Sequence, residues 1–149
     1  MSGKPEDKTQ ESQPSVKETG ITDPRARNRE FKSYRDLEVW QKAMDLVVEC
    51  YRITKQFPKS ETFGLASQLQ RAGVSIPANI AEGRARKYTK EFLRHLSIAY
   101  GSLAELETHI LIAERLNYLD SDHSKELMNR MSIVGRMING LRKSLDKKT

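Results

Sequence analysis

Along most of the chain, apolar residues recur at alternating spacings of three and four positions, the period of a helix with one buried face. No two-residue alternation of the kind that predicts strands competes with this pattern. It predicts four helices, over about residues 36–57, 61–83, 89–116 and 122–146. Because the connections are short, we expect an all-α fold, an antiparallel up-down-up-down four-helix bundle over residues 33–149.

The first predicted helix carries more apolar surface than a helix at the edge of a monomeric bundle needs. Its apolar residues form two adjacent rows. One row contains Leu37, Trp40, Met44, Val47 and Tyr51, and the other contains Ala43, Leu46, Cys50, Ile53 and Phe57. Two rows indicate burial on more than one side. We therefore expect the protein to form an oligomer, with Trp40 at an interface.

A few residues with special backbone preferences set the predicted helix ends. Asp36 is a good N-cap for the first helix, and Pro58 ends that helix. Pro77 lies inside the second helix, but Gly73 stands four positions before it, where a missing side chain gives the backbone room to bend. We therefore expect a kink at Pro77 rather than a break. Gly83 then fits a C-cap in the left-handed conformation.

A polar stripe runs along one face of the second predicted helix. Arg71, Ser75, Asn79 and Glu82 follow one another at spacings of four, four and three. Beside apolar rows, such a stripe fits a buried hydrogen-bond network that determines how helices or subunits pair. Because Arg71 and Glu82 are about three turns apart, we expect their partners on another helix or another subunit. A ligand site is the alternative interpretation.

The glycines are dispersed along the chain and form no phosphate-binding loop. Gly101 and Gly135 lie inside the third and fourth predicted helices. A glycine there costs up to about 1 kcal/mol, which a close approach between helices would offset. We therefore expect both glycines, and Gly101 in particular, to have a structural or interface role.

The residues able to carry chemistry do not gather into a catalytic or metal-binding pattern. Cys50 lies in an apolar row, so we interpret it as a buried structural thiol rather than a nucleophile. His95 and His109 each follow a glutamate by four residues, which fits hydrogen-bonded pairs at the surface. Di-metal sites in helical bundles instead use a Glu-x-x-His spacing of three. We expect no enzyme, no cofactor and no metal site.

Residues 1–32 differ in composition from the rest of the chain. They are rich in Lys, Glu, Ser, Thr, Gln and Pro, with too few apolar residues to offset the entropy lost on folding. We expect a disordered polar tail that becomes basic near its end. The chain has one cysteine, no apolar run near the roughly 20 residues of a membrane span, and no secretory signal. We therefore expect a cytoplasmic protein with no membrane partner.

The formal net charge of +6 is concentrated in three segments. Residues 25–35, 84–94 and 136–148 each carry five basic residues and one acidic residue. In an up-down-up-down bundle these segments share one end, which is then strongly basic. Such an end fits nucleic-acid binding through phosphate contacts. The alternative is that these Lys and Arg residues only complement helix dipoles and aid solubility.

The candidate nucleic-acid-binding residues belong to the second and third of these segments. They are Arg84, Arg86, Lys87, Lys90, Arg94, Arg142 and Lys143. Tyr88 lies within the same basic run, where an aromatic ring could stack on a base. A single aromatic residue gives this interpretation only limited support.

Two segments resemble the family of 23S ribosomal RNA intervening-sequence proteins, RAGVSIPANIAEG at residues 71–83 and GSLAELE at residues 101–107. The resemblance extends over about residues 33–145. It implies a four-helix bundle that forms ring-like homopentamers, and it implies no catalytic residue. The chain is also similar to the accessory variability determinant of diversity-generating retroelements, a basic pentameric barrel. That similarity implies nucleic acid and the retroelement reverse transcriptase as partners.

We therefore expect a non-enzymatic oligomeric bundle, by its resemblance a homopentamer, whose basic end binds nucleic acid. RNA is the expected nucleic acid in preference to DNA. The alternative is a protein-interaction scaffold, in which the oligomer docks a partner such as a reverse transcriptase and the basic end only assists.

Overall fold

The computed structural model describes residues 33–147, so the predicted disordered tail at residues 1–32 lies outside the described residues. The described part of the chain is all helical, and the predicted all-α fold is confirmed. Its four α-helices are α3 (Glu38–Thr54), α4 (Leu65–Ala85), α5 (Thr89–Arg115) and α6 (Ser121–Asp146). Two short 3-10 helices precede α3 and α4, namely η1 (Tyr34–Asp36) and η2 (Lys59–Glu61).

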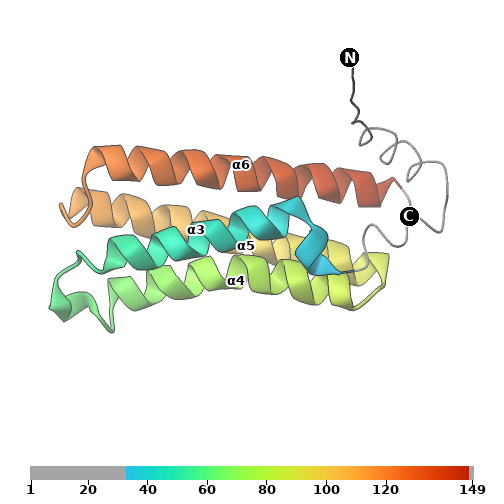
Figure 1. The fold of residues 1–149 in the computed structure, drawn as a ribbon, viewed down its shortest axis with the longest axis horizontal. Helices are drawn as coiled ribbons and strands as arrows, with labels where there is room; N and C mark the ends of the chain where they lie inside the picture. The colour runs from blue at the N-terminus through green and yellow to red at the C-terminus, as the bar shows by residue number, and fades with distance from the viewer. Residues whose placement is uncertain (1–32, 148–149) are drawn as a thin grey trace, which may run out of the picture. The chain divides into compact units, whose positions relative to one another are not determined.

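The four helices pack side by side in an antiparallel bundle (Figure 1). Each helix contacts the next one along the chain, and α3 also contacts α6, which closes the bundle around one core. The apolar rows predicted from the sequence face that core. The largest fully buried side chains are Leu46, Leu69, Ile76, Ile80, Leu96, Leu106, Ile110 and Ile138.

The first helix is shorter than predicted at both ends. Asp36 does not cap α3, because it lies in η1, where Ser33 Oγ accepts a hydrogen bond from the Arg35 backbone N–H. α3 begins after Leu37 and ends at Thr54. Phe57 continues the chain in a turn, with its backbone N–H donating to the Thr54 carbonyl, and its side chain is buried.

The second helix passes through Pro77 without a break. Its start lies after η2, where Glu61 Oε1 accepts a hydrogen bond from the Leu65 backbone N–H at 2.9 Å. The prediction that Gly83 caps this helix is wrong, since Gly83 is helical and buried and α4 continues to Ala85. The left-handed conformation that follows α4 belongs to Lys87, whose φ is 68°.

Gly83 has a packing role instead. A Cβ atom at this position would lie 2.6 Å from the Cβ of His95 and 3.1 Å from Cδ1 of Phe92. Gly135 similarly lets α6 approach α5, because its Cβ would lie 3.1 Å from Cδ2 of Leu103. Gly101 differs, with nothing within 4 Å of the Cβ position. The close approach expected at Gly101 is therefore not made within the described chain.

We predict that Gly83→Ala lowers the free energy of unfolding by about 1–3 kcal/mol, because the added methyl group overpacks the α4–α5 contact. Gly140→Ala is the matched control, since nothing lies within 4 Å of its Cβ position. The control should raise the free energy of unfolding by up to about 1 kcal/mol through helix propensity. Urea denaturation followed by circular dichroism, at one protein concentration, measures both. Equal shifts in the two variants would contradict the packing role of Gly83.

Candidate nucleic-acid interface

One end of the bundle collects three segments that are far apart in the sequence. Figure 1 shows the start of α3, the α4–α5 connection and the end of α6 together, on the right of the view. The connection between α4 and α5 spans only residues 86–88, so the helices turn back sharply there. The α3–α4 and α5–α6 connections lie at the other end of the bundle.

This topology brings the candidate nucleic-acid-binding residues into one region, which we call the basic end. Most of these side chains are exposed, whereas Arg84 and Arg142 are partly buried. Tyr88, in the α4–α5 connection, is 73% exposed. The basic end comprises Arg84, Arg86, Lys87, Lys90 and Arg94 from α4, α5 and their connection, and Arg142 and Lys143 from α6.

Two arginines of the basic end already have carboxylate partners. Arg86 Nη2 lies 3.0 Å from Glu82 Oε2, and Arg94 Nη2 lies 3.2 Å from Glu91 Oε1. The hydrogen bond from Arg94, together with the nearby positive charge of Arg94 and Arg86, holds the pKa of Glu91 below its ordinary value. These pairs are solvent-exposed, so an anionic ligand can compete for the arginines at little cost.

The three lysines of the basic end are the available cations. Lys87, Lys90 and Lys143 are exposed, and none has an ion pair with any residue in the described range 33–147. An ammonium group on a flexible stem is a point charge that can follow a phosphate without a fixed geometry. These lysines are therefore free to contact an extended anion.

Arg142 holds a more fixed position than the lysines. Its Nη1 donates a hydrogen bond to Oδ1 of Asn139 at 3.1 Å, and its guanidinium carbon lies 5.7 Å from the centre of the Tyr100 ring. This cation–π contact joins α6 to α5. Because no carboxylate in the described chain neutralises Arg142, its charge remains available at the edge of the basic end.

The polar stripe of α4 forms a hydrogen-bond network with α5, beside the basic end. Ser75 Oγ and Ser102 Oγ lie 2.7 Å apart. Asn79 Nδ2 donates to Ser75 Oγ at 3.0 Å, and Asn79 Oδ1 lies 3.0 Å from Nδ1 of His95. Because the amide oxygen can only accept, the His95 proton is on Nδ1. This arrangement matches the pairing role expected for Ser75 and Asn79.

The two outer residues of the stripe behave differently from the two inner ones. Glu82 bonds to Arg86 on its own helix, although its Oε2 also lies 3.9 Å from Nε2 of His95. Arg71 is exposed and has no hydrogen bond or ion pair with any other described residue. A partner for Arg71 on another subunit stays a prediction.

The prediction that both histidine–glutamate pairs lie at the surface is wrong. His95 is 3% exposed and His109 is 8% exposed. Glu105 is near its histidine, with Oε2 at 3.4 Å from Nε2 of His109. The other ring nitrogen, Nδ1 of His109, is buried and has no hydrogen-bond partner in the described chain. A spacing of seven places His95, Ser102 and His109 on one stripe facing α4, and this signal was present in the sequence.

The described part of the chain holds one cysteine, which is buried, and no group of residues placed to bind a metal ion. Cys50 is fully buried, and desolvation, with a smaller effect of Glu49, raises the pKa of its thiol to about 12. Such a thiol is protonated at neutral pH and is not a nucleophile. Within residues 33–147, no three His, Cys, Asp or Glu side chains are placed to hold a metal ion. None of the helices in that range is long and apolar enough to cross a membrane.

Comparison with known proteins identifies the family. The family model described as 23S rRNA-intervening sequence protein matches residues 35–140. The chain belongs to this family. A solved structure is also similar, that of a protein of unknown function from the S23 ribosomal protein family of Bacteroides thetaiotaomicron VPI-5482. Its TM-score is 0.64 at 22% identity, covering 70% of this chain and 98% of that one, which shows a shared fold. A comparison with curated proteins finds no match.

The segments that carried the resemblance to the 23S rRNA-intervening sequence proteins have a clear place in the fold. The segment at residues 71–83 supplies Ser75, Asn79 and Gly83, which meet α5 directly. The segment at residues 101–107 supplies Ser102, the partner of Ser75. The resemblance in these segments therefore corresponds to the α4–α5 contact.

Trp40 packs edge-on against Tyr34 with ring centres 5.3 Å apart, and its interface role stays a prediction.

We predict that Asn79→Ala lowers the free energy of unfolding by about 1–3 kcal/mol, because Nδ1 of His95 would stay buried without its acceptor. Asn129→Ala is the matched control, since Asn129 is exposed on α6 and makes no side-chain hydrogen bond within the described chain. The control should change the free energy of unfolding by less than about 0.5 kcal/mol. Urea denaturation measures both variants, and equal values would show that the network contributes nothing.

Proposed function

We propose that this 23S rRNA-intervening sequence protein is a non-enzymatic nucleic-acid-binding protein and that the basic end is its binding surface. The observation that carries the proposal is the antiparallel topology, which gathers basic residues of α4, α5 and α6 at one end. The opposite end carries Glu61, Glu114, Asp120, Asp122 and Glu126 against Lys55, Lys59, Arg115 and Lys125, so it has a small negative excess. The charge of the protein is thus polarised along the bundle.

Binding at the basic end depends on phosphate contacts. When Lys87, Lys90 and Lys143 contact phosphates, they displace the counterions that are condensed on the nucleic acid. The affinity therefore depends on the salt concentration and not on the base sequence. Arg86 and Arg94 add contacts by exchanging their exposed glutamate partners for phosphate oxygens, which guanidinium groups bind in a bidentate manner.

RNA is the proposed ligand in preference to double-stranded DNA. Tyr88 is 73% exposed beside Lys87, and an exposed ring within a cationic surface can stack on an unpaired base. Unpaired bases occur in the loops and bulges of structured RNA.

We predict that replacing Lys87, Lys90 and Lys143 together by Ala weakens RNA binding and flattens its salt dependence. For each protomer that contacts the RNA, the slope of log K against log salt should fall by about 2–3, because each lost phosphate contact removes about 0.7–0.9. Fluorescence anisotropy with labelled RNA across a salt series measures the slope.

The matched control replaces three exposed lysines near the opposite end, Lys55, Lys59 and Lys125, by Ala. It removes the same net charge. Because these three lysines lie away from the basic end, the slope should stay nearly unchanged. Equal effects of the two triple variants would show that net charge alone drives binding. No binding by the wild type at low salt would also contradict the proposal.

We also propose that the protein acts as a homo-oligomer, a pentamer by its family resemblance. The second apolar row of α3 is buried in the core, but much of the first row stays accessible. Met44 is 40% exposed, Val48 beside it is 48% exposed, and Tyr51 is 44% exposed. A contiguous exposed apolar strip of this kind is typical of an association surface. Repeated copies of the basic end would then bind one RNA with increased avidity.

We predict that Met44→Glu with Tyr51→Glu converts the oligomer to a monomer, because two charges enter the exposed strip of α3. Light scattering should give five times the 17.1 kDa chain mass for the wild type and a single chain mass for the variant. The control, Gln56→Glu with Gln68→Glu, adds the same charge at exposed polar positions and should stay oligomeric. A monomeric wild type at micromolar concentration would overturn this part of the proposal.

A further inference from the structure

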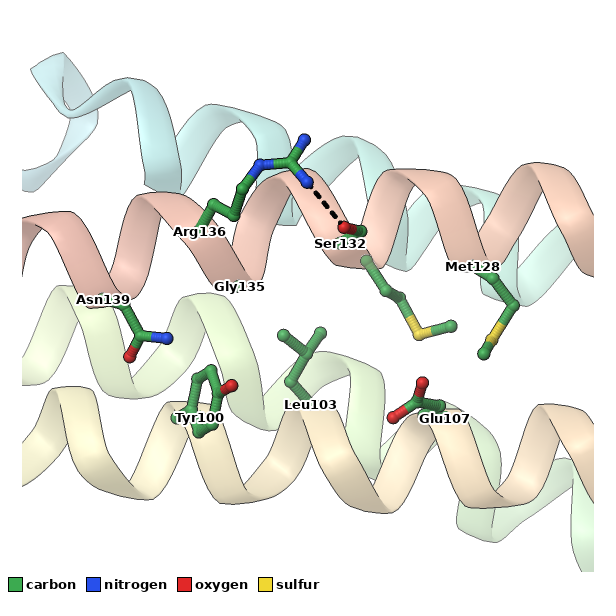
Figure 2. Close-up of a pocket in the computed structure, with 9 residues that line it drawn as sticks. Tyr100, Leu103, Glu107, Met128, Ser132, Gly135, Arg136 and Asn139 are labelled. Carbon is green, nitrogen blue, oxygen red and sulfur yellow. Dashed lines mark hydrogen bonds between the residues drawn. The ribbon is translucent and has the colours of Figure 1, made fainter.

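A groove runs between α5 and α6 and starts beside the basic end (Figure 2). It has a volume of about 260 Å³. Figure 2 shows Tyr100 and Asn139 toward one end of the groove and Glu107 toward the other. Gly135 lines the groove at a point where α6 approaches α5 closely, since a Cβ atom there would lie 3.1 Å from Cδ2 of Leu103 and 3.7 Å from Cε1 of Tyr100.

The lining of the groove suits a small planar ring with polar edges. Leu103 and Met131 are buried and form an apolar floor, and Tyr100, which is 40% exposed, contributes an aromatic ring. Oδ1 of Asn139 is occupied by Arg142, but its amide NH₂ donates to no group in the described chain. The carboxylate of Glu107 also has no partner there. The groove therefore offers two unused donors and an unused acceptor around an apolar floor.

Two guanidinium groups flank this lining. Arg136 lies on the rim, where its Nη1 donates to Ser132 Oγ at 2.9 Å (Figure 2). Arg142 lies over the Tyr100 ring. Within residues 33–147, neither arginine has a carboxylate partner. A planar ring in the groove would thus have two positive charges of α6 nearby that no carboxylate of the described chain neutralises, and these can pair with the phosphates of a nucleotide within a strand.

We propose that the α5–α6 groove binds one unpaired nucleobase of the strand held at the basic end. The base packs on Leu103 and Met131, the Asn139 amide donates to a ring nitrogen or carbonyl oxygen of the base, and Glu107 accepts from an exocyclic amino group. Arg136 and Arg142 contact the flanking phosphates. This inference rests on the proposed nucleic-acid binding and specifies the ligand as a single-stranded nucleic acid.

The size and position of the groove favour this occupant over a larger ligand. Its volume is below the usual range of about 300–1,000 Å³ for small-molecule pockets, so it takes one ring system rather than an extended molecule. Arg142 belongs both to the groove edge and to the basic end, so a strand bound at that end passes the groove. A base in a duplex would first have to leave its stack, whereas an unpaired base enters directly.

The test compares two oligonucleotides of equal length with the full chain. One is single-stranded RNA, and the other has the same phosphate backbone without bases. We expect the wild type to bind the RNA about five- to one-hundred-fold more tightly, the contribution typical of one stacked base. Ser132→Trp fills the groove from an exposed position and should reduce this preference to the part that stacking on Tyr88 at the basic end supplies. Binding of the backbone without bases should fall far less, because the lysines of the basic end lie outside the groove and only Arg136, which donates to Ser132 Oγ, is disturbed.

Ser144→Trp is the matched control, because Ser144 is exposed on the same helix and does not line the groove. It should keep the preference of the wild type. Equal wild-type affinity for both oligonucleotides would overturn the base site while leaving phosphate binding intact. Binding of neither would refute the proposed function itself. A second probe, an arginine-rich peptide, tests whether the groove binds a cationic side chain through Glu107 instead. If Ser132→Trp kept the base preference but lost binding of this peptide, the inference would be wrong.

Discussion

The close approach of α4 and α5 is the contact on which the rest of this protein depends. It requires small residues on both helices, because Gly83 packs against His95 and Ser75 meets Ser102 at 2.7 Å. A side chain larger than these would separate the helices and leave the buried His95 without its acceptor on Asn79. The contact is therefore specified by a combination of missing volume and paired polar groups, each of which would be unfavourable alone.

The positions of the basic end and of the groove both follow from that contact. With α4 and α5 packed closely and joined by residues 86–88, the cationic connection lies at one end of the bundle. The end of α6 then reaches the same place through Arg142 and Tyr100. The α5–α6 contact is close at Gly135, and a groove lined by residues of both helices, among them Tyr100 and Asn139, remains along it. One face of α5 thus closes the core and another lines a candidate site.

Sequence reasoning predicted the helices and their antiparallel packing, but it misjudged several of the residue contacts between helices. The apolar period gave four helices because burial on one face imposes that period on any amphipathic helix. The same reasoning misplaced Gly83 as a cap and assigned a close approach to Gly101, where nothing lies within 4 Å. A glycine in the sequence shows only that a side chain is missing. Whether that glycine caps a helix or permits close packing depends on the atoms of the neighbouring helix that lie opposite it. His95 and His109 were placed at the surface because their polarity outweighed their position on a buried stripe.

The amino-acid sequence by itself determined the all-helical fold, the family and the concentration of basic residues in a few segments, since these follow from local periodicity, motif and composition. Only the tertiary structure decided that the cationic segments of α4, α5 and α6 meet at one end, whereas the pairs Arg86–Glu82 and Arg94–Glu91 have local spacings of four and three that the sequence already shows. It also decided that Gly83 and Gly135 each permit a close contact between helices, whereas nothing lies within 4 Å of the Cβ position of Gly101. These outcomes depend on which side chains of other helices arrive opposite each residue, and the spacing of residues along one helix does not contain that information.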